Sequence, residues 1–136
     1  MISFNQRIKK MAKLNHDFRR EVFTTGRLQV VLMALQPEEE VGMETHADTD
    51  QLFYIVKGEG RAIVGGESRP IEKGSLVVVS AGTPHNLVND AGESLKLFTI
   101  YVPPHHLPGT VHATREEAMD AELNATRASL PCEITQ

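Results

Sequence analysis

The sequence has few of the residues that mark disulfide-bonded, membrane-spanning or low-complexity proteins. Its 136 residues include one cysteine and no tryptophan, and only 5% of them are aromatic. A lone cysteine, Cys132, cannot form a disulfide within the chain, which is typical of a reducing compartment. No apolar run approaches the roughly 20 residues of a membrane span, and no apolar segment follows the first basic residues as a secretory signal requires. We therefore expect a cytoplasmic protein without a membrane partner.

The chain also lacks a strong excess of one charge. It has 14 basic and 18 acidic residues, and its formal net charge is −4. A basic segment covers the first 30 residues and could contact nucleic acid, but the overall acidic balance argues against that. We expect no nucleic-acid partner and interpret the segment as a solvated face, or as an arm that lies on an acidic partner subunit. Its basic residues are Arg7, Lys9, Lys10, Lys13, Arg19, Arg20 and Arg27.

Short apolar runs between turn residues fill the chain from residue 27 to residue 102. Gly65 and Gly66 separate two such runs and are typical of a two-residue β-hairpin. Residues 75–80 form a continuous apolar run, which favours a strand buried on both faces. Strands of this length and spacing predict an all-β sandwich or barrel. The predicted strands cover 28–35, 41–46, 51–57, 61–64, 67–71, 75–80, 85–89 and 95–102.

The two ends of the chain depart from this strand pattern. Residues 5–18 have apolar positions at loosely helical spacing. Thr114 and Glu117 match a capping box, in which the Thr114 hydroxyl accepts from the Glu117 amide and the Glu117 carboxylate reaches back to an amide at the start of the helix. We predict a short C-terminal helix on the surface. The predicted division is an N-terminal arm (1–26), a β-barrel (27–112) and a C-terminal helix and tail (113–136).

Four side chains that can bind a metal are predicted to converge inside the barrel. Glu44 and His46 alternate on one strand, so they share a face about 7 Å apart. Gln51 opens the next strand after a polar loop, and the turn at residues 82–84 delivers His85 onto a later strand. The predicted metal ligands are Glu44, His46, Gln51 and His85, and Phe53 and Ile55 on the Gln51 face are predicted to line the pocket.

The chemistry of these four donors favours a divalent transition metal. No thiolate is present, so a structural zinc site of the cysteine type is excluded. Imidazole and carboxylate ligands suit Mn, Fe, Ni, Co or Zn. Four protein ligands leave one or two positions for water or a substrate, which catalysis requires. Because Glu44 is the only anionic ligand, the bound ion keeps a net positive charge and favours anionic or enediol-like oxygen donors.

Each candidate ligand also has an ordinary structural interpretation. A Glu-x-His pair on a strand often faces solvent, Gln51 can hydrogen-bond a backbone group, and His85 can be a core histidine. The other histidines have no assigned role. Those after the last strand could form a lid or bind a second metal, but a solvated loop is the simpler interpretation. These unassigned residues are His16, His105, His106 and His112.

Two segments of the chain resemble the sequence motifs of the cupin superfamily. Residues 42–60 resemble the first motif, in which Glu44 stands where a first histidine is usual, His46 matches the second histidine, and Gln51 replaces the usual glutamate. Residues 74–89 resemble the second motif, with the family positions held by Gly74, Gly82, His85 and Asn89. The chain looks closer still to small bacterial single-domain cupins, often labelled mannose-6-phosphate-isomerase-like.

This resemblance implies a double-stranded β-helix, or jelly roll, with a divalent metal inside the barrel. It also implies a homodimer that pairs through sheet faces and binds a small molecule. It does not imply one activity, because the superfamily includes enzymes, sugar-binding domains and storage proteins. Three functions therefore stay open. They are a metal-dependent isomerase, lyase or dioxygenase acting on a small polar or anionic metabolite, a non-catalytic metabolite or sugar sensor, and a structural module stabilised by its metal.

Overall fold

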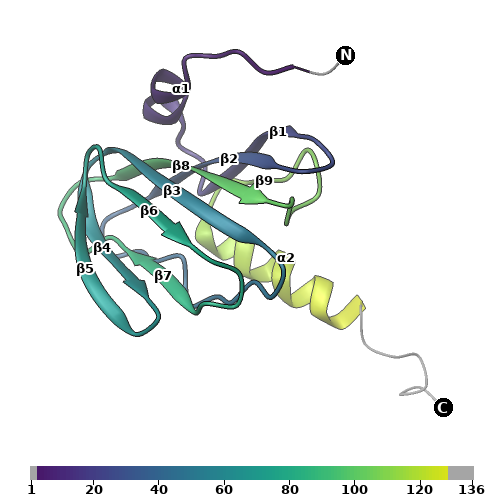
Figure 1. The fold of residues 1–136 in the computed structure, drawn as a ribbon. Helices are drawn as coiled ribbons and strands as arrows, with labels where there is room; N and C mark the ends of the chain where they lie inside the picture. The colour runs from purple at the N-terminus through teal and green to yellow at the C-terminus, as the bar shows by residue number, and fades with distance from the viewer. Residues whose placement is uncertain (1–2, 129–136) are drawn as a thin grey trace.

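Nine strands and two helices make up the computed structural model, which describes residues 3–128 (Figure 1). The elements are α1 (Ile8–Leu14), β1 (Arg19–Thr24), β2 (Gln29–Leu35), β3 (Asp50–Lys57), β4 (Glu59–Val64), β5 (Glu67–Glu72), β6 (Leu76–Val79), β7 (His85–Val88), β8 (Leu95–Val102), β9 (Val111–His112) and α2 (Arg115–Ala128). The larger sheet has the order β6-β3-β8-β2-β1-β9, and the smaller has the order β5-β4-β7. All strand pairs are antiparallel.

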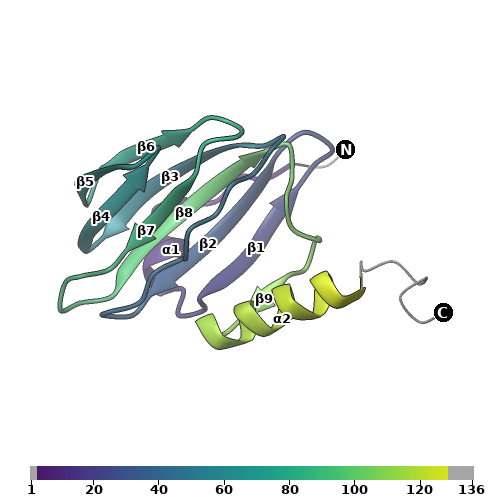
Figure 2. The ribbon, with the colours of Figure 1, turned by 90° about the horizontal axis from the view of Figure 1, so that it is seen from below.

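The two sheets enclose the main apolar core, and α1 adds a second, smaller core on the outer face of the larger sheet. Every residue of β2 is buried, because one of its faces points between the sheets and the other lies under α1. Figure 2 shows the helices on different sides, with α1 behind the larger sheet and α2 beside β9. The predicted all-β double-stranded β-helix with a C-terminal helix is confirmed.

Strand β6 is not buried on both faces, so this prediction was wrong. Leu76 and Val78 are 58% and 60% exposed, whereas Val79 is 2% exposed. The strand lies at the edge of the larger sheet, and α1 packs over β8, β2 and β3. An apolar run in the sequence indicates that its side chains favour burial. It does not indicate whether another element covers the outer face of the strand.

In place of the predicted strand over residues 41–46, the structure has two isolated bridges to β7, one at residue 40 and one at residue 44. Glu40 pairs with Val88 and Glu44 pairs with His85, so the segment advances by four residues while β7 advances by three. The extra residue makes a bulge, which Gly42 accommodates with a φ of 100°. This irregular segment adds an edge to the smaller sheet and brings Glu44 to the end of the barrel.

The described segments nearest the two termini pack against the sheets. The segment predicted as an N-terminal arm contains β1, which pairs with β2 and β9. The capping box is present, since the Glu117 amide donates to Thr114 Oγ1 over 3.1 Å, and the Glu117 carboxylate accepts from the Ala113 amide over 2.8 Å. Cys132 lies outside the described residues. Neither helix in the described part of the chain is long and apolar enough to cross a membrane.

Gly60 is the point where β4 and β7 leave no room for a side chain. A Cβ at residue 60 would overlap the carbonyl oxygen of Val88, and a backbone atom cannot rotate away. We expect Gly60→Ala to lower the free energy of unfolding by about 1–3 kcal/mol, measured by urea denaturation. The control is Gly92→Ala, where an added Cβ would meet no atom within 4 Å apart from its chain neighbours. It should change the free energy of unfolding by less than about 0.5 kcal/mol. Equal stability of the two variants would contradict this packing.

Candidate metal centre

The site is built on the pairing of Glu44 with His85. The two residues exchange both backbone hydrogen bonds, each 2.9 Å long. Directly opposed residues of an antiparallel pair place their side chains on the same face of the sheet. The pairing holds the bulged segment and β7 in a register that brings a carboxylate beside an imidazole. The two segments are about 40 residues apart in sequence.

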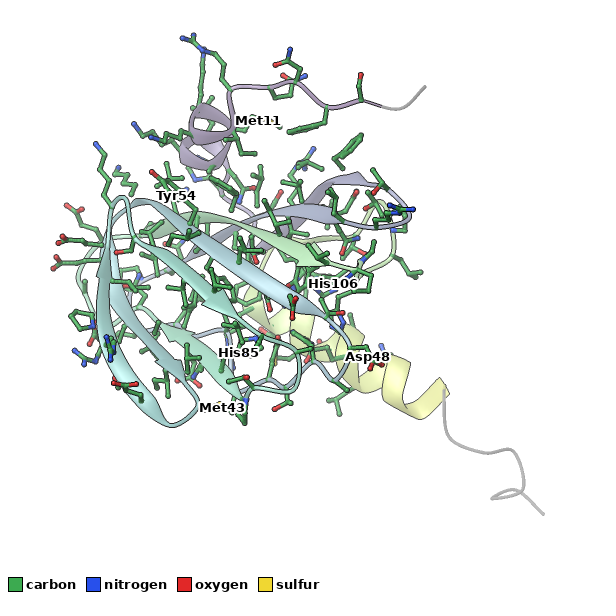
Figure 3. All side chains as sticks on the ribbon, viewed as in Figure 1. Met11, Met43, Asp48, Tyr54, His85 and His106 are labelled. Atoms are coloured by element: carbon green, nitrogen blue, oxygen red, sulfur yellow. The ribbon has the colours of Figure 1, made fainter. Side chains whose placement is uncertain are left out.

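Three of the four predicted ligands converge around this pair. The candidate ligand atoms of Glu44, His46 and His85 all lie within 4.8 Å of one another. The buried Nε2 atom of His46 lies at ion-pair distance, 3.1 Å, from Glu44 Oε2, and it makes no aligned hydrogen bond within the described residues. The structure thus brings together a carboxylate and two imidazoles, one of which contacts the carboxylate directly. Figure 3 labels His85 between the two sheets.

Gln51 joins the group through a chain of hydrogen bonds that fixes its amide. Thr99 donates its hydroxyl to the Leu52 carbonyl, so the Thr99 oxygen accepts from Gln51 Nε2 over 2.9 Å. This places Gln51 Oε1 3.1 Å from His85 Nε2. His85 Nδ1 is 2.9 Å from the Thr83 carbonyl and donates to it, which leaves a lone pair on Nε2. A neutral His85 ring thus directs its Nε2 lone pair at the Gln51 oxygen, and a proton or a metal ion between the two atoms would relieve that contact.

This donor set fits a divalent transition metal. It offers one carboxylate, two imidazoles and one amide oxygen, and the His46 nitrogen and the Gln51 oxygen each lie 3.1 Å from another donor atom of the set. Such mixed nitrogen and oxygen ligands suit Mn, Fe, Co, Ni or Zn. The Thr83 carbonyl supplies the outer hydrogen bond that metal-binding histidines generally have.

Glu44 is held in its charged form. Burial raises the pKa of its carboxyl, but the His46 imidazole 3.1 Å away and the charge of Arg19 lower it, and the pKa lies below its ordinary value. The carboxylate is therefore ionised at neutral pH and is available as an anionic metal ligand.

Phe53 and Ile55 lie behind the ligand group. Both are fully buried, at 1% and 0% exposure, and belong to the main core. The centroid of the Phe53 ring is 6.0 Å from that of His85. Phe53 packs beside His85 from the barrel interior, and neither residue is among those that line the cavity at its open side.

A cavity of about 540 Å³ opens beside Glu44 and His46. It lies between β1, the segment of the two ligands, the loop between β8 and β9, and α2. Its volume suits a small metabolite. The lining residues are Arg19, Glu44, Thr45, His46, His105, His106, Leu107, Thr110, His112, Ala121 and Glu122.

The histidines after β8 lie in a largely exposed loop, as the simpler interpretation expected, but two of them also contact the site. His105 is exposed overall although its ring packs on His46, and His106 is partly buried. The ring centroids of His105 and His46 are 4.1 Å apart, and His106 Nε2 is 3.2 Å from the Tyr101 hydroxyl. Burial lowers the pKa of His105 and lowers the pKa of His106 to about 2, so both rings are neutral at pH 7. Figure 3 shows His106 on the side of the barrel nearer α2, whereas His16 lies elsewhere, 3.3 Å from Lys96 Nζ.

Arg19 is a functional candidate that the sequence did not reveal. Its side chain is 1% exposed, and its Nη2 atom lies 3.9 Å from Glu44 Oε1. The neighbouring Arg20 is 51% exposed, although the two residues look alike in the sequence. Recognising β1 as a strand would have placed the two side chains on opposite faces, but not shown which one is buried.

Comparisons with known proteins agree with this fold. The model of the cupin domain family matches residues 31–101. The Bacillus subtilis protein YrkC is 39% identical over 121 residues, which are 85% of this chain and 65% of YrkC. A crystal structure from Bacillus halodurans is 35% identical and has a TM-score of 0.86, covering 88% of this chain and 95% of that one. An oxalate-binding protein from Thermotoga maritima is 27% identical over 94 residues, which are 69% of this chain and 78% of that protein.

The chain thus spans slightly less than two thirds of YrkC and nearly all of the Bacillus halodurans protein. The family model covers just over half of the chain, including all four predicted ligands. Together with the two facing sheets and the grouped Glu44, His46 and His85, this match shows that the chain belongs to the cupin superfamily.

Proposed function

We propose that this cupin is a metal-dependent enzyme that acts on a small polar or anionic metabolite, by isomerase, lyase or dioxygenase chemistry. One observation carries the proposal. Candidate ligand atoms of Glu44, His46 and His85 converge within 4.8 Å of one another, and Glu44 and His46 line the wall of a cavity. Structural metal sites are closed by protein ligands, whereas a site beside a cavity leaves room for a substrate.

The residues around the site have separable roles in this proposal. Glu44, His46, Gln51 and His85 would hold a divalent metal, which polarises oxygen atoms of a bound molecule. The Thr83 carbonyl keeps the Nε2 lone pair of His85 directed inward.

Proton transfer would fall to the residues on the other side of the cavity. His105 is neutral and can accept a proton from a ligand, whereas His106, with its pKa lowered to about 2 and its Nε2 facing the Tyr101 hydroxyl, is too weak a base for that role. Tyr101 is fully buried with a raised pKa, so it keeps its proton and donates to His106 Nε2.

A non-catalytic metabolite or sugar sensor is the second candidate. It would use the same ligands and the same cavity, and the name of the oxalate-binding relative favours it. The mannose-6-phosphate-isomerase-like subtype and a cytoplasmic location follow from the sequence and stay predictions.

Homodimer formation is a further part of the proposal. Leu76 and Val78 project from an edge strand and are mostly exposed. Adjacent exposed apolar side chains on a sheet edge are unfavourable in water and are typical of an interface. We propose that a second copy of the chain covers this face of the larger sheet.

Metal content tests the ligand assignment. We expect the purified wild-type protein, after incubation with Mn²⁺ or Fe²⁺, to retain one ion per chain by elemental analysis. Glu44→Ala and His85→Ala should each lose most of the metal while circular dichroism reports a folded β-protein. The control is His16→Ala, outside the ligand group, and it should retain the metal. Full occupancy in both ligand variants would refute the assignment.

Turnover distinguishes the enzyme from the sensor. We expect the metal-loaded protein to convert one of a panel of small diols and hydroxy or oxo acids, and His85→Ala to abolish the conversion because its metal is lost. An oxygen electrode separates the reaction types. Oxygen uptake indicates a dioxygenase, and turnover without uptake indicates an isomerase or lyase. Tight binding without turnover would contradict the enzyme and favour the sensor.

The dimer is tested by light scattering after size-exclusion chromatography. We expect the wild-type protein to be a dimer at micromolar concentration, and Val78→Lys to shift it toward the monomer because the charge would be buried in the interface. Leu123→Lys is the matched control, since Leu123 is 56% exposed on α2, away from the sheet edge. A monomeric wild-type protein would contradict the proposal.

A further inference from the structure

Arg19 is a buried cation whose hydrogen-bonding groups are poorly satisfied. A guanidinium has five N–H donors, and a buried one normally finds partners for them. The closest hydrogen-bonding contact of Arg19 is from Nη1 to His112 Nδ1, at 3.4 Å. Its Nε has no partner among the described residues, although the side chain is only 1% exposed.

The carboxylates near Arg19 do not satisfy these donors. Glu44 Oε1 is 3.9 Å from Nη2, and Glu122 Oε1 is 3.8 Å from Nη1. Both distances exceed those of charge-assisted hydrogen bonds, which are about 2.7–2.9 Å. The two carboxylates balance the charge of Arg19 at a distance, and they leave its N–H groups available to an acceptor that enters the cavity.

The position of Arg19 is fixed before any ligand binds. It is the first residue of β1, where it pairs with Met33 of β2 on one side and His112 of β9 on the other. Its guanidinium also lies over the Phe18 ring, with 5.4 Å between the charged carbon and the ring centroid. A preorganised side chain loses little conformational entropy on binding.

Arg19 and the metal-ligand group share one cavity. Arg19, Glu44 and His46 all line it, and the 3.9 Å between Arg19 and Glu44 places the guanidinium next to the metal ligands. A molecule of a few carbons can therefore contact both, if it has an acceptor at one end and metal-binding oxygens at the other.

We propose that Arg19 binds a carboxylate of the ligand, while other oxygens of the same molecule reach the metal-ligand group. The ligand class is a short dicarboxylate, or a 2-oxo or 2-hydroxy carboxylate. This inference rests on the proposed function, whose substrate class it narrows. A planar carboxylate matches the two parallel donors of a guanidinium. At Arg19 a phosphate dianion fits less well than a single carboxylate, because the carboxylates of Glu44 and Glu122 lie close to the guanidinium and repel the second negative charge.

Calorimetric titration of the Mn²⁺-loaded protein with malonate tests this inference. We expect Arg19→Met to weaken malonate binding by at least about tenfold, the usual effect of losing a charged hydrogen bond, without loss of metal. Arg19→Lys keeps the charge without the planar fork, so it should bind with intermediate affinity. The control is Arg20→Met, which alters the exposed neighbour that pairs with Asp17, and it should bind as the wild type does.

The ligands provide a test that does not depend on a folded variant. Wild-type protein should bind malonate more tightly than the neutral malonamide, and inorganic phosphate should compete poorly with malonate. Equal binding of malonate by wild type and Arg19→Met, or effective competition by phosphate, would overturn the inference. Metal retention without malonate binding would refute the Arg19 inference alone. Failure to retain metal would refute the proposed function, and the same titrations of the metal-free protein would then test Arg19 separately.

Discussion

The backbone pairing of Glu44 with His85 is the constraint on which the site depends. Its two hydrogen bonds attach an irregular segment to the edge of the smaller sheet. Without them, the carboxylate and one imidazole would sit on a free loop, and His46 would lose its position against His85, 5.2 Å away between ring centroids. The bulge at Gly42 makes the pairing possible, because it absorbs the residue by which the segment exceeds β7. The Asn86 side chain secures the bulge by accepting from the Gly42 amide over 2.8 Å.

Grouping these donors has an energetic cost that the surrounding fold offsets. A neutral His85 ring opposite the Gln51 oxygen, and a buried His46 nitrogen with no aligned hydrogen bond, are unfavourable in a protein interior. The apolar core holds the strands in place regardless, and Thr99 and Thr83 fix the orientations of the amide and imidazole. Such local frustration within a well-packed frame is typical of functional sites.

Much of the fold and part of the site could be predicted from the sequence. Alternating apolar runs and glycine turns predicted the β-barrel, and the motif spacing identified Glu44, His46 and His85 as neighbours. The extent of the strand at 41–46 could not be predicted, because a bulge depends on the register with β7. Exposure of Leu76 and Val78 depends on which elements cover a sheet, and apolar periodicity does not contain that information.

The positions of Arg19, His105 and Gln51 depend on contacts between segments that are distant in sequence. Arg19 and Arg20 have the same chemistry, and only the packing of β1 buries one and exposes the other. His105 contacts His46 because the chain turns back toward the cavity after β8. The orientation of Gln51 is set by Thr99, 48 residues later in the chain. Each of these is a tertiary interaction without a local sequence signal.

The most direct test of the metal centre is anomalous diffraction at the absorption edge of the metal, from crystals of protein loaded with Mn²⁺ or Fe²⁺. We predict one strong anomalous peak about 2.0–2.3 Å from four ligand groups. These are a carboxylate oxygen of Glu44, ring nitrogens of His46 and His85, and the side-chain oxygen of Gln51. A map with no peak among these atoms, or with its main peak at another group, would contradict it.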